Sequence, residues 1–142
     1  MQNYANHARF DLGYHKILGP VLLLTFIGSC VNFAESVGDH QRFYSASLIL
    51  VLSACLLATT LYARIFPLKA QDRAIRAEEG LRHYVLTGKL LDSRLSAPQV
   101  VALRFASDAE FPTLASRAAT ENLTSKEIKQ SIKTWRPDDY RV

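Results

Sequence analysis

The sequence predicts an all-α protein in which a two-helix transmembrane hairpin precedes a small cytoplasmic helical bundle. Two long runs without a charged side chain occupy residues 17–34 and 44–63. Fourteen of the 17 lysines and arginines lie from Arg64 onward. An apolar part that suits lipid is therefore followed by a charged part that suits water. Three helix-start patterns then follow. We therefore expect an amphipathic N-terminal segment (1–16), a transmembrane hairpin (17–66), a cytoplasmic helical domain (67–136) and an extended tail (137–142).

Residues 1–16 are expected to lie along the lipid headgroups as an amphipathic segment. Tyr4, His7 and Tyr14 recur at roughly helical spacing there, mixed with cationic side chains. His7 and His15 are the candidates for cofactor binding. They are eight residues apart, more than two helical turns, which is too far to share one metal ion. The sequence therefore predicts no cofactor and no metal site.

The two uncharged runs are long enough to span a membrane. They contain 18 and 20 residues, which as helices would reach roughly 27 and 30 Å against a hydrocarbon layer about 30 Å thick. A soluble bundle is the competing interpretation. It is disfavoured because a chain of 142 residues has too little other apolar surface to cover two helices that are apolar on every side.

A cleaved lipoprotein signal is another interpretation of the first run, because residues 27–30 read IGSC and would end in an acylated Cys30. The sixteen residues before the run are long for such a leader. Cys30 and Cys55 lie one in each run, without a CxxC spacing or a nearby histidine. This pattern favours free, packed cysteines over a metal or redox pair.

Neither run contains an Asp, Glu, His, Lys or Arg. Proton relays, ion pathways and axial haem ligands need such side chains inside the membrane, so these functions and a channel of assembled copies are disfavoured. Asn32, the most polar residue of the runs, is predicted to make a helix–helix hydrogen bond or a cap. Gly28, Ala54 and Ala58 are small enough for close helix contact, either inside the hairpin or with an outside partner.

The basic residues predict the orientation. Two Lys or Arg precede the first run, one lies between the runs, and five lie between Arg64 and Arg82. Because such residues near span ends are retained on the cytoplasmic side, both termini are predicted to be cytoplasmic. Pro67 disfavours a helical Phe66 and is predicted to bend or restart the second helix. The residues expected at headgroup depth are Tyr14, Lys16, Tyr44, Tyr62, Arg64 and Lys69.

The domain after the second run is expected to begin with a helix over residues 68–86 that ends at the Thr87–Gly88 turn. Capping boxes mark later helices, because a hydroxyl accepts a backbone N–H and a side chain three residues on reaches back. The three boxes are Ser96–Gln99, Ser107–Glu110 and Thr124–Glu127. The i,i+4 ion pairs expected on the first helix are Asp72/Arg76 and Glu78/Arg82.

Apolar spacing then assigns the buried face of each short helix. We expect the central helix to bury Val100, Val101, Leu103 and Phe105, the next Phe111, Leu114 and Ala118, and the last Ile128, Ile132 and Trp135. Pro137 is expected to end the helical part. A bundle of about 75 residues buries a modest fraction of its surface, so it is expected to lean on the membrane or on a partner.

No catalytic constellation is present in the sequence. From Arg64 onward there are fourteen basic and ten acidic residues, and this mild excess is spread along the chain, which disfavours nucleic-acid binding. His83 stands alone, without an HExxH motif or a Gly-rich phosphate loop. The charged surface is instead a candidate for docking a partner, through Arg73, Arg76, Glu79, Arg82 and Trp135.

The motifs also carry a resemblance. NYANHARFDLGYH before the hairpin, then QDRAIRAEEGLR, LTGKLLDSRL, ALRFASDAEF and EIKQSIKTWRPDDYRV, resemble a small bacterial two-transmembrane-helix family known only as a domain of unknown function. The resemblance covers essentially the whole chain. It implies a bacterial inner-membrane protein with this topology and supplies no catalytic or binding residues. The chain departs from the expected pattern at Leu12–Gly13, which affects only the start of the first helix.

Two functional hypotheses follow. The first is a non-enzymatic accessory, scaffold or assembly subunit of a larger membrane complex, for which a respiratory or photosynthetic assembly is a possible host. Its expected partners are membrane lipids and other membrane-protein subunits, or further copies of itself. The alternative is a membrane-tethered sensor or enzyme that uses His7, His15 or His83 at the headgroup interface.

Overall fold

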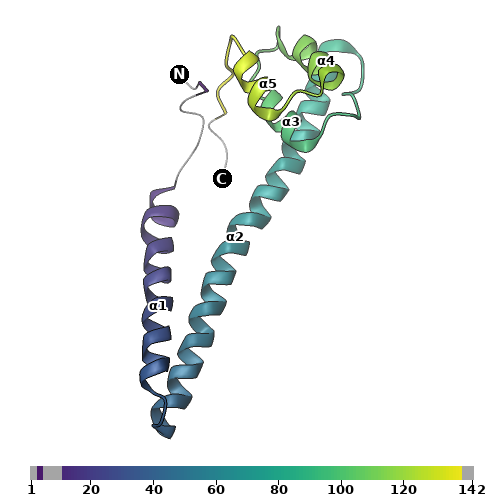
Figure 1. The fold of residues 1–142 in the computed structure, drawn as a ribbon. Helices are drawn as coiled ribbons and strands as arrows, with labels where there is room; N and C mark the ends of the chain where they lie inside the picture. Colours follow the sequence, from purple (N-terminus) through teal and green to yellow (C-terminus); the bar gives the residue numbers. More distant parts are fainter. Residues whose placement is uncertain (1–2, 5–10, 139–142) are drawn as a thin grey trace. The chain divides into compact units, whose positions relative to one another are not determined.

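The computed structural model describes residues 3–4 and 11–138 and confirms an all-α fold (Figure 1). Two long apolar helices pack as a hairpin and are followed by a small helical bundle. The chain divides into two compact units at residues 66–67. The unit Arg9–Phe66 is called the hairpin here. The other unit, Met1–Ala8 with Pro67–Val142, is described over residues 3–4 and 67–138 and is called the head.

The hairpin begins with a π-helical segment, η1 (Leu12–Leu18), which continues into α1 (Gly19–Glu35). The Asp11 carboxylate caps η1 by accepting a hydrogen bond from the Tyr14 backbone N–H at 2.7 Å. α2 (His40–Thr87) starts after a turn of four residues, 36–39. Gly38 takes a positive φ of 101° there, a conformation that suits a residue without Cβ. Both helices thus reach further into the nine-residue connection than the uncharged runs indicated.

α2 passes through Pro67 without interruption. The expectation that the helix restarts at this residue is wrong. Proline removes the hydrogen bond to the carbonyl of Ala63 and crowds that carbonyl, yet the helix continues for twenty residues beyond it. The boundary between the two units nevertheless falls between Phe66 and Pro67. α2 therefore contributes residues 40–66 to the hairpin and 67–87 to the head, and it ends at Gly88, as predicted, with a φ of 70°.

The head surrounds one hydrophobic core. After α2 come α3 (Ala97–Leu103), α4 (Phe111–Glu121) and α5 (Ser125–Ser131). Phe105 and Phe111 are 1% and 0% exposed, the largest fully buried side chains. The apolar faces predicted for the central and following helices are confirmed, apart from Val101, which is half-buried. The core comprises Leu95, Val100, Ala102, Leu103, Phe105, Ala106, Phe111, Leu114, Ala115, Ala118, Leu123, Ile128 and Ile132.

Two of the three predicted capping boxes are formed. Gln99 accepts from the Ser96 backbone N–H at 2.8 Å, and Glu127 accepts from the Thr124 backbone N–H at 2.7 Å. Ser107 instead uses its carbonyl oxygen, which accepts from the backbone N–H of Phe111 at 2.9 Å. α4 then begins at Phe111.

Glu110, the expected partner of Ser107, holds the C-terminal segment instead. Its carboxylate accepts hydrogen bonds from the backbone N–H groups of Lys133 and Thr134, both at 3.1 Å. The prediction of a capping box at this position is therefore wrong. Each carboxylate oxygen of Glu110 accepts from one of these two backbone donors.

The last helix is shorter than predicted. α5 ends at Ser131, so Trp135 is not its third apolar position. Residues 133–136 instead lie beside the loop after α3, where Arg136 N–H donates to the Phe105 carbonyl at 2.7 Å. Trp135 forms an isolated antiparallel bridge with Ala106, and its ring lies 5.1 Å from that of Phe105. The tryptophan thus packs on the core from the segment after α5.

Candidate functional site

The contact between α1 and α2 centres on two serines. The hydroxyls of Ser29 and Ser53 lie 2.8 Å apart, and both residues are buried, at 4% and 5% exposure. Each hydroxyl also lies within hydrogen-bond distance of a carbonyl on its own helix, those of Phe26 and Leu50. A polar pair is thus fully satisfied inside the contact, which apolar surroundings require.

The residues that face this contact recur every third or fourth position on both helices, the spacing of left-handed helix packing. They are half-buried or buried and comprise Leu22, Phe26, Ser29, Phe33 and Ser36 on one side and Ala46, Leu50, Ser53, Leu57 and Thr60 on the other. At the turn end, the rings of Phe33 and Phe43 lie 5.0 Å apart. At the open end, the Tyr14 hydroxyl donates to the Thr60 carbonyl.

The small residues predicted for helix contact do not form this interface. Gly28, Ala54 and Ala58 are exposed on the hairpin surface, and Asn32 is half-buried. A Cβ added to Gly28 would meet no described atom within 4 Å. The sequence left open whether the small residues contact the other helix of the hairpin or an outside partner. Inside the hairpin, the serines make the contact instead. Contact of the small residues with an outside partner stays a prediction.

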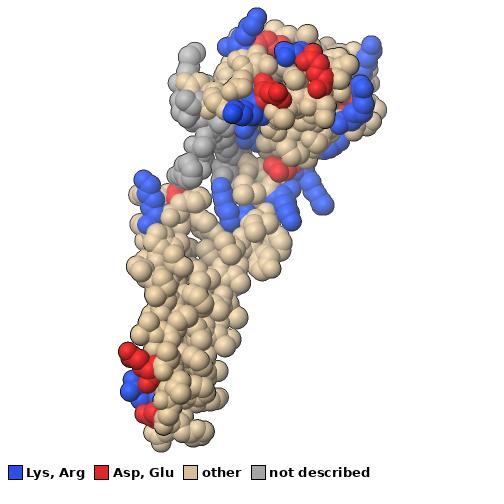
Figure 2. Space-filling view, viewed as in Figure 1, with Lys and Arg blue, Asp and Glu red and all other residues tan. Residues whose placement is uncertain are grey.

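The outer surface of the hairpin is apolar. Among its large side chains, Leu24 is 68% exposed and Leu52 is 62% exposed. Figure 2 shows that charged side chains gather on the head and at the ends of the hairpin, while the hairpin's length is uncharged. Within the described residues, two helical stretches, Leu12–Glu35 and His40–Thr87, are long and apolar enough to cross a membrane.

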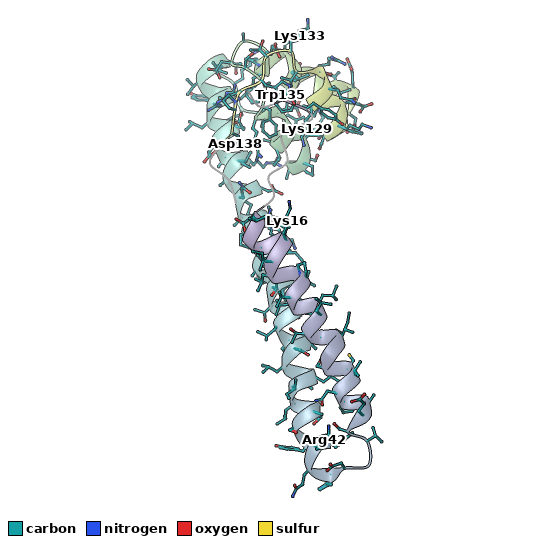
Figure 3. All side chains as sticks on the ribbon, turned by 90° about the vertical axis from the view of Figure 1, so that its left-hand side faces the viewer. Lys16, Arg42, Lys129, Lys133, Trp135 and Asp138 are labelled. Carbon is teal, nitrogen blue, oxygen red and sulfur yellow. The ribbon has the colours of Figure 1, made fainter. Side chains whose placement is uncertain are left out.

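The expected headgroup anchors lie near the ends of the hairpin. Figure 3 shows Lys16 at its open end and Arg42 at its turn end. Tyr62 is 57% exposed and stacks on Phe66 with ring centroids 5.3 Å apart. Tyr14 departs from the expectation, because its hydroxyl is used between the helices. Of the remaining anchors, Arg64 is half-buried and those exposed are Lys16, Tyr44 and Lys69.

In the head, Arg82 joins α2 to the other helices. Its guanidinium donates to Glu79 at 2.8 Å, to Asp108 at 2.7 Å and to the Ala106 carbonyl at 2.7 Å. The same group lies 4.5 Å from the centroid of the Phe111 ring. Such a planar cation combines ion pairing with stacking. α2 is thereby fixed to the loop after α3 and to the start of α4.

Glu79 receives a second cation. Its side chain is only 7% exposed, and Arg136 lies 3.7 Å from it. Together with Glu78, Arg82 and Asp108, these residues line an open hollow of about 390 Å³. Three acids and two arginines line it; Glu79 and Asp108 pair with the arginines, so the hollow carries both signs of charge.

The predicted docking residues are therefore divided. Glu79, Arg82 and Trp135 are engaged inside the head, which corrects their assignment as surface docking groups. Arg73 and Arg76 are exposed. The pair expected at Glu78/Arg82 is replaced by Glu79/Arg82 at spacing i,i+3, because Glu79 lies on the inner face of α2 beside Arg82.

The histidine candidates have structural hydrogen bonds where they are described. His7 lies outside the described residues. The Nδ1 atom of His15 is 3.1 Å from the Asp11 carbonyl oxygen, and that of His83 is 2.9 Å from the Lys89 carbonyl oxygen. A carbonyl only accepts, so each Nδ1 carries the proton and donates. Over residues 3–4 and 11–138, no three His, Cys, Asp or Glu side chains come together as metal ligands would.

Two carboxylates of the head have shifted pKa values. Hydrogen bonds from the Arg94 side chain and backbone lower the pKa of Asp92 to about 2. The Thr124 hydroxyl and backbone N–H lower the pKa of Glu127, the acid of the capping box that starts α5. Asp92 is half-buried and Glu127 is exposed, and both shifts come mainly from local hydrogen bonds. They mark a turn and a helix start rather than a reactive centre.

Comparison with known families identifies the family of this chain. Over residues 1–142 it matches the model of a family described as a family of unknown function, DUF6526. The chain belongs to this family. No match was found among curated proteins or among solved structures. Membership of the DUF6526 family confirms that the chain belongs to a family of unknown function. The bacterial origin and the membrane location of the protein stay predictions.

Proposed function

We propose that this DUF6526 protein is a non-enzymatic integral protein of the bacterial inner membrane. Its two spans would carry the head on the cytoplasmic side, with both termini cytoplasmic. There it would act as an accessory, scaffold or assembly subunit of a larger membrane complex. The observation that carries the proposal is the apolar outer surface of the hairpin.

That surface suits hydrocarbon and not water. Large apolar side chains are exposed along both helices, including Leu24 and Leu52, and contiguous apolar patches of this extent on a water-exposed protein favour aggregation. The serines at the centre of the hairpin turn inward and pair with each other. Within a helix the backbone N–H and C=O groups bond to one another, which a lipid environment demands.

The charge distribution supports the orientation. The head follows the second span and carries most of the lysines and arginines, whereas Arg42 is the one basic residue between the two uncharged runs. Lys and Arg close to span ends are retained on the cytoplasmic side. The turn of the hairpin would therefore face the periplasm.

An interaction role fits the chemistry of the head. Its polar side chains stabilise the fold: Arg82 fixes α2, Gln99 donates to the Leu123 carbonyl at 2.8 Å, and Glu110 holds the C-terminal segment. No observation on the described residues favours the sensor or enzyme alternative, because His15 and His83 each donate to a backbone carbonyl. Because these polar side chains of the described head hold its fold together, they support a scaffold role.

Cysteine labelling tests the topology. Cys30 and Cys55 are replaced by alanine, and a cysteine is placed either at Val37, in the turn, or at Ser116, on α4. Both positions are exposed. With a membrane-impermeant maleimide, Val37→Cys should label in intact spheroplasts and Ser116→Cys only after lysis. Labelling of Ser116→Cys in intact spheroplasts would contradict the proposed orientation, and recovery of the protein in the soluble fraction would contradict membrane insertion.

Isolation in mild detergent tests the scaffold role. The tagged full chain should be recovered in an assembly larger than one chain, together with a stoichiometric membrane partner or further copies of itself. Recovery as a lone chain at every detergent concentration that keeps it folded would contradict the role. The same preparation, analysed for bound metal and pigments, should contain neither in stoichiometric amount.

A further inference from the structure

The part of α2 that belongs to the head carries an exposed apolar seam. Its residues follow one another at intervals of four, three, four and three positions, and all of them are exposed. The two large ones, Leu81 and Tyr84, are 66% and 52% exposed. The seam consists of Ala70, Ala74, Ala77, Leu81 and Tyr84.

The seam lies on the face of α2 that the head leaves unused. The opposite face holds Ile75, Glu79 and Arg82. Ile75 and Glu79 are each 6% exposed, and Arg82 is paired with Asp108. These three are themselves spaced at i, i+4 and i+7, so they define one stripe of the helix. The seam runs parallel to that stripe on the other side, where the helix has no packing partner among the described residues.

The alternating intervals are those of the a and d positions of a coiled coil. Three alanines at the start of the seam let a second backbone approach closely, and two large side chains follow to fill the space. Val85, 75% exposed, extends the apolar surface beside Tyr84. Such a face suits another helix better than it suits water.

Two opposite charges flank the seam on its two edges. Arg73 precedes Ala74, and Glu78 follows Ala77, which places them at g and e positions. Both are exposed, and within the part of the chain that the structure describes neither takes part in an ion pair. In a parallel pair of helices a g residue faces the e residue five positions later on the other helix, and Glu78 is five positions after Arg73.

We propose that two copies of this protein associate in parallel through the α2 seam, with Arg73 of each copy facing Glu78 of the other. The parallel direction rests on the proposed membrane location, because two copies inserted with the same topology present α2 in the same direction. An antiparallel pair would instead oppose arginine to arginine and glutamate to glutamate. The charges therefore select the direction that the membrane also imposes.

Insertion in the membrane makes association through this short seam more favourable. Five seam positions make about two heptads, and isolated helices of this length associate weakly in water. Confinement of both copies to one bilayer, with one shared orientation, lowers the rotational and translational cost of association. The seam then determines which faces meet.

Charge reversal provides the decisive test, using the full chain in lipid nanodiscs or mild detergent. Arg73→Glu and Glu78→Arg should each weaken self-association about tenfold, because each replaces two attractive contacts by two repulsive ones. Arg76→Glu makes the same charge change on the same helix outside the seam and should have no effect. Equal weakening by Arg76→Glu would overturn the proposal.

Mixing the two reversed variants adds a result that misfolding cannot produce. Arg73→Glu and Glu78→Arg copies, carrying different tags and expressed together, should co-purify, because every facing pair between them is again opposite in sign. The double variant should likewise recover self-association. Failure of both recoveries would overturn the proposed pairing.

Disulfide trapping tests the seam itself. In a chain with Cys30 and Cys55 replaced by alanine, Ala77→Cys should form a cross-linked dimer on mild oxidation, and Arg76→Cys should form far less. The membrane fraction is measured in the same samples. A chain that stays in the membrane without cross-linking at residue 77 overturns the seam alone, whereas a chain found in the soluble fraction overturns the proposed function.

Discussion

The hairpin and the head solve the same packing problem in opposite ways. In the hairpin the buried contact holds a serine pair, and the large apolar side chains face outward, with Leu24 68% exposed. In the head the largest buried side chains are apolar, with Phe105 1% exposed, and charged side chains gather on the surface (Figure 2). This contrast is what the proposed function expects of one unit in lipid and one in water, although α2 runs through both.

Truncating a large apolar residue in each unit should give the largest contrast. Phe105→Ala removes a buried ring from the head and should lower its free energy of unfolding by about 3–5 kcal/mol. Leu24→Ala removes an outward-facing side chain from the hairpin and should leave that free energy unchanged. Denaturant unfolding of the purified full chain, followed by Trp135 fluorescence, measures both. A small effect of Phe105→Ala would mean that the head has no cooperative core.

Placing a charge on each unit should give an effect nearly as large. Leu24→Arg puts a cation near the middle of the first span and should disfavour insertion by about 3 kcal/mol. Leu90→Arg, at a head position that is 82% exposed, should be neutral. The fraction of protein resistant to alkaline extraction from membranes is the measurement. An unchanged membrane fraction for Leu24→Arg would show that its surroundings are aqueous.

Removing the central cation of the head tests its ion pairs. Arg82→Met leaves the buried Glu79 with only the more distant Arg136 as a cation. The substitution should destabilise the head by about 2 kcal/mol, which is less than the loss expected when a buried acid keeps no cation at all. Arg73→Met, at an exposed position, is the matched control and should change stability by less than about 0.5 kcal/mol. Chemical unfolding of both variants compares them. Equal stability of the two would contradict the role given to Arg82.

The serine contact should contribute less. Ser29→Ala and Ser53→Ala, alone and combined, should reveal a coupling free energy of about 0.6 kcal/mol, typical of hydrogen bonds between helices in membranes. Thr25→Ala is the control, because the Thr25 hydroxyl bonds only to its own helix, at the Val21 carbonyl. Unfolding of the hairpin in bicelles gives the three differences. Strictly additive effects of the two serine changes would show that the hydroxyls do not interact.

The smallest effect concerns Asp92. Its pKa is lowered from 3.8 to about 2, so its contribution to stability is fully present above pH 3.8 and is lost as the pH falls through about 2. Asp92→Asn should therefore flatten the dependence of head stability on pH between about 4 and 2 without changing the fold. Thermal unfolding at several pH values measures the slope. If the unsubstituted protein and Asp92→Asn show the same slope of stability against pH, Asp92 is not the source of the pH dependence.

Local and periodic features were predictable from the sequence. The two long apolar helices follow from length and absence of charge, the end of α2 from Gly88, two helix starts from their capping boxes, and the buried faces of α3 and α4 from apolar spacing. Each of these depends on interactions within a few residues or on burial averaged over a helix. Such information is carried by the sequence without knowledge of the tertiary arrangement.

Choices between competing partners were not predictable. Arg82 selects Glu79 and Asp108, the latter 26 residues away, over Glu78, and Glu110 selects backbone donors 23 and 24 residues away over Ser107. Trp135 fits a helical spacing in the sequence, although it lies after the end of α5 and forms an isolated bridge with Ala106. These outcomes depend on the tertiary arrangement. The serine contact was not predictable either, because both runs are apolar on every side and spacing alone does not single out the faces that carry Ser29 and Ser53.

The surroundings of Cys55 test most directly the claim that the hairpin lies in lipid. This cysteine is free, exposed and near the middle of the second span. A nitroxide attached to it in proteoliposomes, with Cys30 replaced by alanine, should be relaxed far more strongly by oxygen, which concentrates in hydrocarbon, than by a water-soluble nickel chelate. A nitroxide on the head at Ser116→Cys should show the reverse. Stronger relaxation of the Cys55 label by the nickel chelate would place the hairpin in water and contradict the account.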